Sequence, residues 1–332
     1  MKNILVTGGA GYVGSGLLRD LLAEGYHVTC IDNLMFGRDS ILDILHKRNF
    51  NFINCDINDS NSLDTIFANN KFDAVIHLAA IVGDPACKLN PELSLKTNLI
   101  SGKWLLEKSK SSNVSKFIFA STCSNYGKMD NPEAYVDENS RLAPVSLYAE
   151  LKVKFENYML NEMKKFDGFS VTSLRFSTVY GLSPRMRFDL TINEFTKDLT
   201  LGKELVVFGE QFWRPYCHVK DFSNAFISIL KASNEKVMNN VFNVGDTKEN
   251  YTKQMIVDEI KKVLPESKIK YVAKNEDPRD YRVNCDKIKN LLGFKISKTV
   301  PDGIREIKRV IEDNLIQDPE NQKYYNIPHQ RK

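Results

Sequence analysis

The feature that most constrains the fold is a glycine-rich turn directly after the first apolar run. The stretch VTGGAGYVGSG follows NILVT and spaces Gly8, Gly11 and Gly14 as GxxGxxG, with leucines at helical spacing behind it. In such a strand–turn–helix unit the first glycine allows the tight turn, and the second lets a pyrophosphate approach the helix N-terminus. The third permits close packing of the helix on the strand. The pattern predicts a dinucleotide-binding unit.

An acidic residue stands where this kind of unit binds the ribose of its cofactor. Asp32 ends the second apolar run, HVTCID, and its carboxylate would accept both ribose hydroxyls of NAD and repel the additional phosphate of NADP. Arg38 lies a few residues further and would favour NADP, but Asp32 and Asn33 precede it, so we expect NAD. Asp56 ends the third run and is a candidate contact to the adenine, with a helix N-terminal acid as the alternative.

Short apolar runs alternate with helical patterns through the first half of the chain. The runs are NILVT, HVTCID, FNFINCD, FDAVIHLA, KFIFAST and VTSLRF. They are continuous rather than alternating, as expected for strands that are covered on both faces. Repeated strand–helix–strand units predict an α/β fold of the Rossmann type, a doubly wound parallel sheet with right-handed crossovers.

The pattern changes after about Phe176, where a loop-like stretch contains Gly181 and Pro184. We expect a helix at 190–201, short strands at ELVVF, near Arg214 and at NVFNVG, a helix at 220–232, and two helices after residue 246. The polar residues from about Gln317 onward predict a loosely held tail. These elements favour a smaller α/β substrate-binding domain that is interleaved with the Rossmann domain.

Composition excludes several classes of function. The formal net charge of the 332 residues is +4, with acidic and basic residues mixed throughout, which argues against nucleic acid as a partner. No segment approaches the roughly 18 apolar residues of a membrane span, and the first apolar run is too short for a signal peptide. The six cysteines form no CxxC pair, so we expect reduced thiols in a cytoplasmic protein. The five histidines show no metal-ligand spacing, and no metal is expected.

A tyrosine and a lysine four residues apart are the candidate catalytic pair. In SLYAELK, Tyr148 and Lys152 are one helical turn apart and share a face of the predicted helix. A free tyrosine has a pKa near 10 and is a poor base at neutral pH. A neighbouring ammonium and the positive nicotinamide ring would lower the pKa of Tyr148. The phenolate would then take a proton from a substrate hydroxyl while hydride leaves the carbon.

The third catalytic candidate is at the end of the fifth run, FASTCSNYG. Because strand side chains alternate, Thr122, Ser124 and Tyr126 are expected on one face and Cys123 on the other. Thr122 is assigned the hydrogen bond to the reacting hydroxyl, and Ser124 is a second contact. His77, in HLAA at the end of the fourth run, is expected to be a buried, hydrogen-bonded histidine rather than a catalyst.

The motifs TGGAGYVG, IDNL, HLAA, STCSNYG, YAELK, LRFSTVYG and WRPYCHVKD together resemble the extended short-chain dehydrogenase/reductases, in particular the NAD-dependent nucleotide-sugar epimerase/dehydratase family. The resemblance implies an NAD-binding domain at 1–176 and 216–245 and a nucleotide-sugar-binding domain at 177–215 and 246–332. It assigns catalysis to Thr122, Tyr148 and Lys152. The implied cofactor-binding residues are Gly8, Gly11, Tyr12, Val13, Gly14, Asp32, Asn33, Asp56, Ile57, Leu78, Ala79, Ala80, Tyr148 and Lys152.

The resemblance also implies where the substrate binds. Arg214 and Arg279 would contact the diphosphate, with Arg282 as an alternative to Arg279. Arg185 and Arg187 in SPRMR are candidates for gripping a phosphate or sugar hydroxyls, with a solvated loop as the alternative. Ser124 and Thr178 complete the predicted substrate-binding set. The partner is expected to be a GDP- or UDP-linked sugar, and the protein is expected to be a homodimer.

Departures from the family pattern narrow the chemistry. Sugar dehydratases of this family carry an Asp-Glu pair after the threonine, where this chain has Cys123 and Ser124, so elimination and decarboxylation are disfavoured. Thr178 replaces an asparagine that is common in epimerases. IDNLMF, SPRMRFDLTINEFT and EDPRDY most resemble a branch that includes GDP-heptose 4-dehydrogenases of bacterial capsule synthesis.

The expected function is therefore oxidation of sugar carbon 4 to a 4-keto species by hydride transfer to NAD, as a 4-dehydrogenase or 4-epimerase in bacterial surface-polysaccharide synthesis. A nucleotide-4-ketosugar reductase is the alternative enzyme. A non-catalytic dinucleotide-binding regulatory module is the alternative from another class, although a module of that kind has no use for a base beside the nicotinamide.

Overall fold

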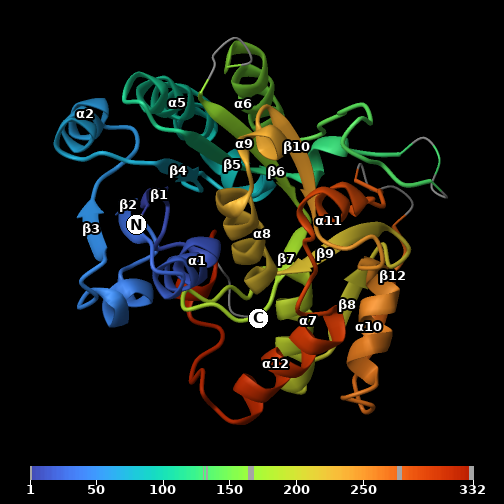
Figure 1. Cartoon of the computed structure of the whole chain (residues 1–332). Coiled ribbons are helices and arrows are strands. Elements are labelled where there is room, and N and C mark those ends of the chain that lie inside the picture. The colour runs from blue at the N-terminus through green and yellow to red at the C-terminus, as the bar shows by residue number, and fades with distance from the viewer. Residues whose placement is uncertain (1, 130, 132–133, 164–167, 275–278, 329–332) are drawn as a thin grey trace.

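The computed structural model describes residues 2–129, 131, 134–163, 168–274 and 279–328. Its centre is a seven-stranded sheet with the order β10-β6-β5-β4-β1-β2-β3 (Figure 1). All its strand pairs are parallel. The strands are β1 (Asn3–Thr7), β2 (His27–Asp32), β3 (Phe50–Asn54), β4 (Ala74–His77), β5 (Lys116–Thr122), β6 (Ser170–Phe176) and β10 (Asn240–Val244).

Helices cover both faces of this sheet, because each strand buries side chains on both sides. Buried leucines of α1 (Tyr12–Ala23) and buried aromatic and aliphatic residues of α8 (Val219–Lys231) form the core of one face. Side chains of α2 (Ser60–Asn69), α5 (Ser101–Ser111) and α6 (Leu147–Met163) form the core of the other. The predicted Rossmann-type doubly wound sheet is confirmed.

A second group of elements packs beside the carboxyl ends of the strands (Figure 1). It contains a three-stranded sheet, β11-β9-β7, and a two-stranded sheet, β12-β8. The strands are β7 (Thr178–Tyr180), β8 (Leu205–Phe208), β9 (Trp213–His218), β11 (Asn250–Thr252) and β12 (Ile269–Val272). Apolar side chains of α7 (Thr191–Thr200), α10 (Lys253–Lys261) and α12 (Val300–Glu312) form its core.

Among the described residues after 246, the structure has one α-helix more than expected. Besides α10 and α12, the structure has α11 (Asp286–Leu292). This helix spans seven residues and ends at Gly293, which has a φ of +67°. Two turns are too few for a helical periodicity to stand out in the sequence.

Short helical segments complete the described chain. They are α3 (Asp84–Leu89), α4 (Pro91–Leu95), α9 (Asn234–Val237), the π-helical η2 (Lys96–Ile100) and the 3₁₀ segments η1 (Asp39–Ile44), η3 (Cys123–Tyr126) and η4 (Gln322–Tyr324). Within the described ranges, no helix combines the length and the apolar character that crossing a membrane requires. All six cysteines are buried free thiols, as expected.

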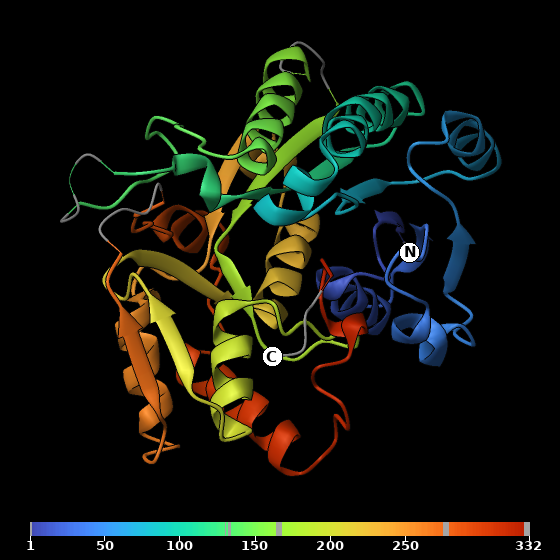
Figure 2. The same ribbon diagram turned by 180° about the vertical axis from the view of Figure 1, so that it is seen from behind.

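The described residues from 317 to 328 are packed rather than loose, which corrects the expectation of a loosely held tail over this range. The hydroxyl of Tyr325 is 2.9 Å from Nζ of Lys197, and the Tyr325 side chain is buried. The backbone N–H of Phe188 donates to the carbonyl of Tyr324 at 2.9 Å. Figure 2 shows this red segment returning from α12 towards the blue α1. The prediction was wrong because it relied on the polar composition and the two prolines of this segment and did not consider that its tyrosines could pack against the core.

Candidate active site

A cavity of about 630 Å³ opens at the carboxyl edge of the large sheet. Its walls come from the loops that follow β1, β2, β3, β4, β5 and β6, and from the second group of elements. In open α/β sheets, ligands bind at the carboxyl ends of the strands, next to the point where the strand order reverses. Chain connectivity therefore brings residues that are more than 300 positions apart to one place.

Every residue predicted for cofactor binding, catalysis and substrate binding lines this cavity. The set comprises Gly8, Gly11, Tyr12, Val13, Gly14, Asp32, Asn33, Asp56, Ile57, Leu78, Ala79, Ala80, Thr122, Ser124, Tyr148, Lys152, Thr178, Arg185, Arg187, Arg214 and Arg279. Arg282, the alternative to Arg279, is not part of the lining. Its guanidinium lies between the rings of Tyr135 and Trp213, 4.8 and 4.9 Å from their centroids.

The glycine loop leaves space for an anion at the start of α1. A Cβ on Gly8 would be 2.7 Å from the backbone of Ala79, and one on Gly14 would be 2.5 Å from the carbonyl oxygen of Gly8. A Cβ on Gly11 would make one tight contact, with the Gly8 oxygen at 3.3 Å, so this position is less crowded than Gly8 and Gly14. No side chain caps the helix at Gly11. The first-turn N–H groups are thus available to a diphosphate.

Asp32 is held in place by two backbone N–H groups. Its Oδ2 accepts from Ala10 at 2.9 Å and its Oδ1 from Leu34 at 2.8 Å. Burial raises the pKa of Asp32, although these two hydrogen bonds counteract it. Asn33 donates from Nδ2 to Oδ2 of Asp56 at 3.0 Å. The ends of β2 and β3 therefore present two carboxylates side by side at the cavity wall.

The predicted pair Tyr148 and Lys152 occupies the first two turns of α6 and faces the cavity. Nζ of Lys152 donates to the carbonyl of Ala120 at 2.8 Å and lies 5.8 Å from the Tyr148 ring centroid. Burial lowers the pKa of Lys152 to about 8. The carbonyl of β5 therefore fixes the ammonium next to the phenol, rather than leaving it in solvent.

The protein alone does not lower the pKa of Tyr148, and the expected lowering also depended on the charge of a nicotinamide ring. Burial raises the pKa of Tyr148, and the nearby Cys87 and Asp84 act in the same direction, while Arg187 lowers it. The physical reason is that the desolvation of a phenolate outweighs the local positive charges. Lowering this pKa is left to positive charge that a bound nicotinamide ring brings into the cavity.

The segment after Thr122 departs from the expected strand alternation. Residues Cys123–Tyr126 form the 3₁₀ turn η3, so side chains no longer alternate. Thr122 and Ser124 line the cavity, but Tyr126 turns into the core, where its hydroxyl donates to Asn243 Oδ1 at 2.7 Å. The Cys123 thiol is also buried and donates to the Arg175 carbonyl at 3.2 Å. The prediction that Tyr126 shares a face with Thr122 is therefore wrong.

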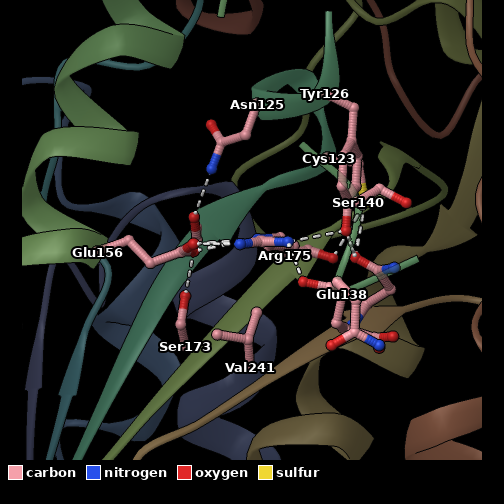
Figure 3. A network of polar contacts seen from close by, with 12 residues as sticks. Cys123, Asn125, Tyr126, Glu138, Ser140, Glu156, Ser173, Arg175 and Val241 are labelled. Carbon is pink, nitrogen blue, oxygen red and sulfur yellow. Dashed lines mark hydrogen bonds and ion pairs between the residues drawn. The ribbon is translucent and has the colours of Figure 1, made fainter. Parts of the chain in front are cut away.

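A buried polar network further along the helix that carries Tyr148 and Lys152 holds α6 on the sheet (Figure 3). Glu156 of α6 accepts from Arg175 Nη2 at 2.6 Å and from Ser173 Oγ at 2.6 Å. Arg175 Nη1 continues to the Tyr126 hydroxyl at 2.9 Å. Both carboxylate oxygens and the guanidinium are thus paired, which a buried charge requires. The network joins β6, α6 and η3 into one rigid support.

His77 has the structural role that was expected. Its Nδ1 lies 2.8 Å from Oγ1 of Thr7, and its ring stacks on Phe119 at 5.9 Å. Burial lowers the pKa of His77 to about 3, so the imidazole is neutral at physiological pH. The residue does not line the cavity.

Four arginines line the half of the cavity beyond β6. Arg187 makes a bidentate pair with Asp189, at 2.8 and 2.9 Å, and Arg279 pairs with Asp84 at 2.8 Å. Arg214 donates to the Trp213 carbonyl at 2.6 Å. Arg185 is buried against the ring of Phe36, 4.2 Å away, and its Nε and Nη2 have no partner among the described residues. This half is therefore suited to an anionic ligand.

Some residues of the site were missed from the sequence. Asp84 accepts from both Ser146 Oγ, at 2.6 Å, and Arg279, and so ties three distant segments together at the cavity. Asn326 and Ile327 reach the lining from the C-terminal residues. None of them belongs to a motif, because their positions depend on contacts between segments that are far apart in the chain.

The fold and the cavity define an enzyme of the dinucleotide-binding α/β class. The sequence profile of the family described as "NAD dependent epimerase/dehydratase family" matches residues 4–245, and the chain belongs to this family. The "Probable UDP-arabinose 4-epimerase 3" of Oryza sativa subsp. japonica is 30% identical over 308 residues, which cover 85% of this chain and 74% of that protein.

Solved structures agree with this assignment. The UDP-glucose 4-epimerase of Thermotoga maritima with UDP-glucose has a TM-score of 0.81 at 29% identity, covering 94% of this chain and 99% of that one. The UDP-glucuronic acid 4-epimerase of Bacillus cereus, in complex with UDP-glucuronic acid and NAD, has a TM-score of 0.81 at 26% identity, with 94% and 99% covered.

The cofactor of the protein is NAD, and the residues present fit it. The cavity is lined by the uncapped start of α1, by Gly11, which has a single close neighbour, and by Asp32. A diphosphate matches the first two features, and a ribose diol matches the third.

Proposed function

We propose that the protein oxidises carbon 4 of a nucleoside diphosphate sugar to a ketone. The observation that carries the proposal is the placement of Thr122, Tyr148 and Lys152 in the same cavity as the glycine loop. Bound NAD supplies a hydride acceptor. A proton acceptor and a hydride acceptor are the two groups that oxidation of a secondary alcohol requires.

Each of the three side chains has a role that follows from its surroundings. Tyr148 takes the proton of the sugar hydroxyl. Lys152, fixed by the Ala120 carbonyl at 2.8 Å, places a positive charge next to the phenol. Thr122, whose Oγ1 accepts from the Ser124 N–H at 3.1 Å, directs its own hydroxyl proton to the reacting oxygen. The donor and the acceptor together orient the sugar before the proton moves.

Elimination of water is not favoured at this site. It needs an acid and a base besides the tyrosine, and the positions after Thr122 hold Cys123 and Ser124. The thiol of Cys123 is buried, and burial raises its pKa far above neutrality. It therefore cannot exchange protons with a sugar in the cavity.

The substrate is proposed to be a UDP- or GDP-linked sugar. Arg214 and Arg279 would bind the diphosphate. The sugar and its neighbouring groups would be bound by Ser124, Thr178, Arg185 and Arg187, and all six residues line the cavity. The solved relatives carry UDP-sugars. The GDP option rests on the resemblance of IDNLMF and SPRMRFDLTINEFT to the GDP-heptose 4-dehydrogenase branch, as does the proposed role in bacterial surface-polysaccharide synthesis.

Two fates of the ketosugar give two activities. If it turns over in the cavity and takes the hydride back, the enzyme is a 4-epimerase. If it leaves, the enzyme is a 4-dehydrogenase that accumulates NADH. Incubation with UDP- and GDP-sugars, followed by NADH absorbance and product NMR, separates the two. If the enzyme reduces a 4-ketosugar with NADH but does not catalyse the oxidation, it is a reductase.

The proposal fails if substitution of the phenol leaves turnover intact. Tyr148→Phe is expected to reduce kcat by about 10²–10⁴-fold, the range typical of a general acid–base group, while NAD still binds. A regulatory module without catalysis would show NAD binding in both proteins and sugar turnover in neither.

The assembly and domain roles are proposed on the same resemblance. Residues 1–176 and 216–245 would bind NAD, residues 177–215 and 246–332 would bind the nucleotide sugar, and the protein would act in the cytoplasm. The long helices α5 and α6 lie side by side on one face (Figure 1), in position to pair with those of a second copy. Light scattering at the mass of a monomer would contradict the homodimer.

A further inference from the structure

The C-terminal segment, residues 319–328, is anchored to α7 by a buried lysine. Lys197, whose side chain is almost fully buried, donates from Nζ to Glu320 Oε1 at 2.8 Å and to the Tyr325 hydroxyl at 2.9 Å. Lys203 adds a second contact to Glu320 at 2.8 Å. The rings of Tyr324 and Phe188 meet edge to face, with centroids 5.5 Å apart. These contacts to Lys197, Lys203 and Phe188 therefore fix the path of this segment.

The anchored segment reaches the wall of the active-site cavity. Asn326 and Ile327 belong to the lining. The backbone N–H of Asn326 donates to Oδ2 of Asp189 at 3.1 Å, and both oxygens of Asp189 hold the guanidinium of Arg187. Arg187 is near enough to Tyr148 for its charge to lower the pKa of the phenol. The segment thus approaches the reactive end of the cavity.

The side chain of Asn326 has hydrogen-bonding capacity that the protein does not use. Among the described residues, its Oδ1 is buried and has no hydrogen-bond partner. A primary amide offers two donors and an acceptor, and rotation about its last bond exchanges which of them faces the cavity. Because this oxygen has almost no accessible surface, the amide must turn before the oxygen can meet a ligand at the cavity wall.

We propose that Asn326 binds a hydroxyl group of the sugar and that the C-terminal segment is part of the substrate-binding wall. This inference rests on the proposed function, since it names a contact to the same substrate. Through Asp189, the segment also holds Arg187 in position. Asn326 lies outside residues 4–245, which match the family profile. As a contact to a sugar hydroxyl, it would contribute to sugar specificity.

The test compares the affinity of the protein for a nucleotide sugar with its affinity for the corresponding nucleoside diphosphate, which lacks the sugar. Binding of UDP-glucose and UDP, and of GDP-mannose and GDP, is measured by calorimetry in the presence of NAD. Asn326→Ala is expected to weaken binding of the preferred nucleotide sugar by about 3- to 10-fold, the effect of one lost hydrogen bond to a neutral group. Affinity for the matching diphosphate and for NAD should not change. Lys323→Ala, an exposed position on the same segment, is the control and should match the wild type.

The outcomes separate this inference from the proposed function. If Asn326→Ala binds the nucleotide sugar as tightly as the wild type does, the sugar contact is rejected. The same follows if the variant loses equal affinity for the nucleotide sugar and for the diphosphate. Neither outcome affects the proposed function. Wild-type protein that binds none of the four nucleotides overturns the proposed function and the inference with it. Tyr325→Phe tests the anchoring, because it removes the hydroxyl that accepts a hydrogen bond from Lys197. The variant should bind the nucleotide sugar more weakly than the wild type, and its melting temperature shows whether it is folded. Unchanged sugar binding by this folded variant rejects the anchoring.

Discussion

Glu156 of α6 and Arg175 of β6 form a buried ion pair, with 2.6 Å between Oε1 and Nη2 (Figure 3). Glu156 follows Lys152 by one helical turn and Tyr148 by two. The pair therefore fixes the helix that carries the proposed proton acceptor against the sheet that carries Thr122. Positioning of this kind lets a cavity hold reacting groups in one geometry.

Breaking this pair is expected to destabilise the protein strongly. Glu156→Gln leaves the buried guanidinium of Arg175 without its counter-charge, and the free energy of unfolding should fall by about 3–5 kcal/mol. Urea unfolding measures it. Arg309→Ala, which removes an exposed pair with Asp313, is the comparison and should cost at most about 1 kcal/mol. Similar losses in the two variants would contradict a buried, fully paired network.

Two glycines of the same loop should respond differently to alanine. Gly14→Ala places a Cβ 2.5 Å from the Gly8 oxygen and should lower the melting temperature, because backbone must shift. Gly11→Ala meets only that oxygen, at 3.3 Å, and its φ of −75° suits alanine, so the variant should fold. Its methyl group would occupy the anion position, and NAD affinity should fall by at least about tenfold. Normal NAD binding by Gly11→Ala would place the diphosphate elsewhere.

Cofactor choice should depend on the charge of Asp32. Asp32→Asn keeps the shape of the side chain but removes the carboxylate that would accept a ribose diol and repel a phosphate. NAD affinity is expected to fall, and the preference for NAD over NADP to shrink by about tenfold. Fluorescence titration with each cofactor gives both dissociation constants. An unchanged ratio would show that another residue discriminates.

The buried ammonium of Lys152 should make stability depend on pH. Its pKa is about 8 in the folded protein, below the ordinary value of 10.5, so the unfolded chain binds more protons between these pH values. The contribution of Lys152 to the free energy of unfolding therefore rises as the pH increases from about 8 to 10.5. Below pH 8, the full cost of burying the charged ammonium lowers the stability.

Comparison with Lys152→Met isolates this contribution, because methionine does not titrate. The free energy of unfolding of the wild type, minus that of the variant, should be about 2–3 kcal/mol larger at pH 10 than at pH 7. Chemical denaturation at both pH values measures it. A difference that is independent of pH would mean that the ammonium is solvated in the folded protein.

The sequence could predict which candidate catalytic and cofactor-binding residues line one cavity, because their geometry is local. Gly8, Gly11 and Gly14 belong to one turn, and the four-residue spacing of Tyr148 and Lys152 sets them on one helix face whatever surrounds it. Continuous apolar runs such as VTSLRF require strands that are covered on both sides, which leaves few alternatives to a doubly wound parallel sheet.

Tertiary structure decided what depends on burial and on contacts across the chain. The pKa of Tyr148 is set by the desolvation of the cavity, which no spacing encodes, and the turn at Cys123 redirects Tyr126 into the core. Asn326 reaches the cavity because Lys197 anchors a segment more than 120 residues away. Such contacts form only when helices and strands have packed, so they leave no periodic signal in the sequence.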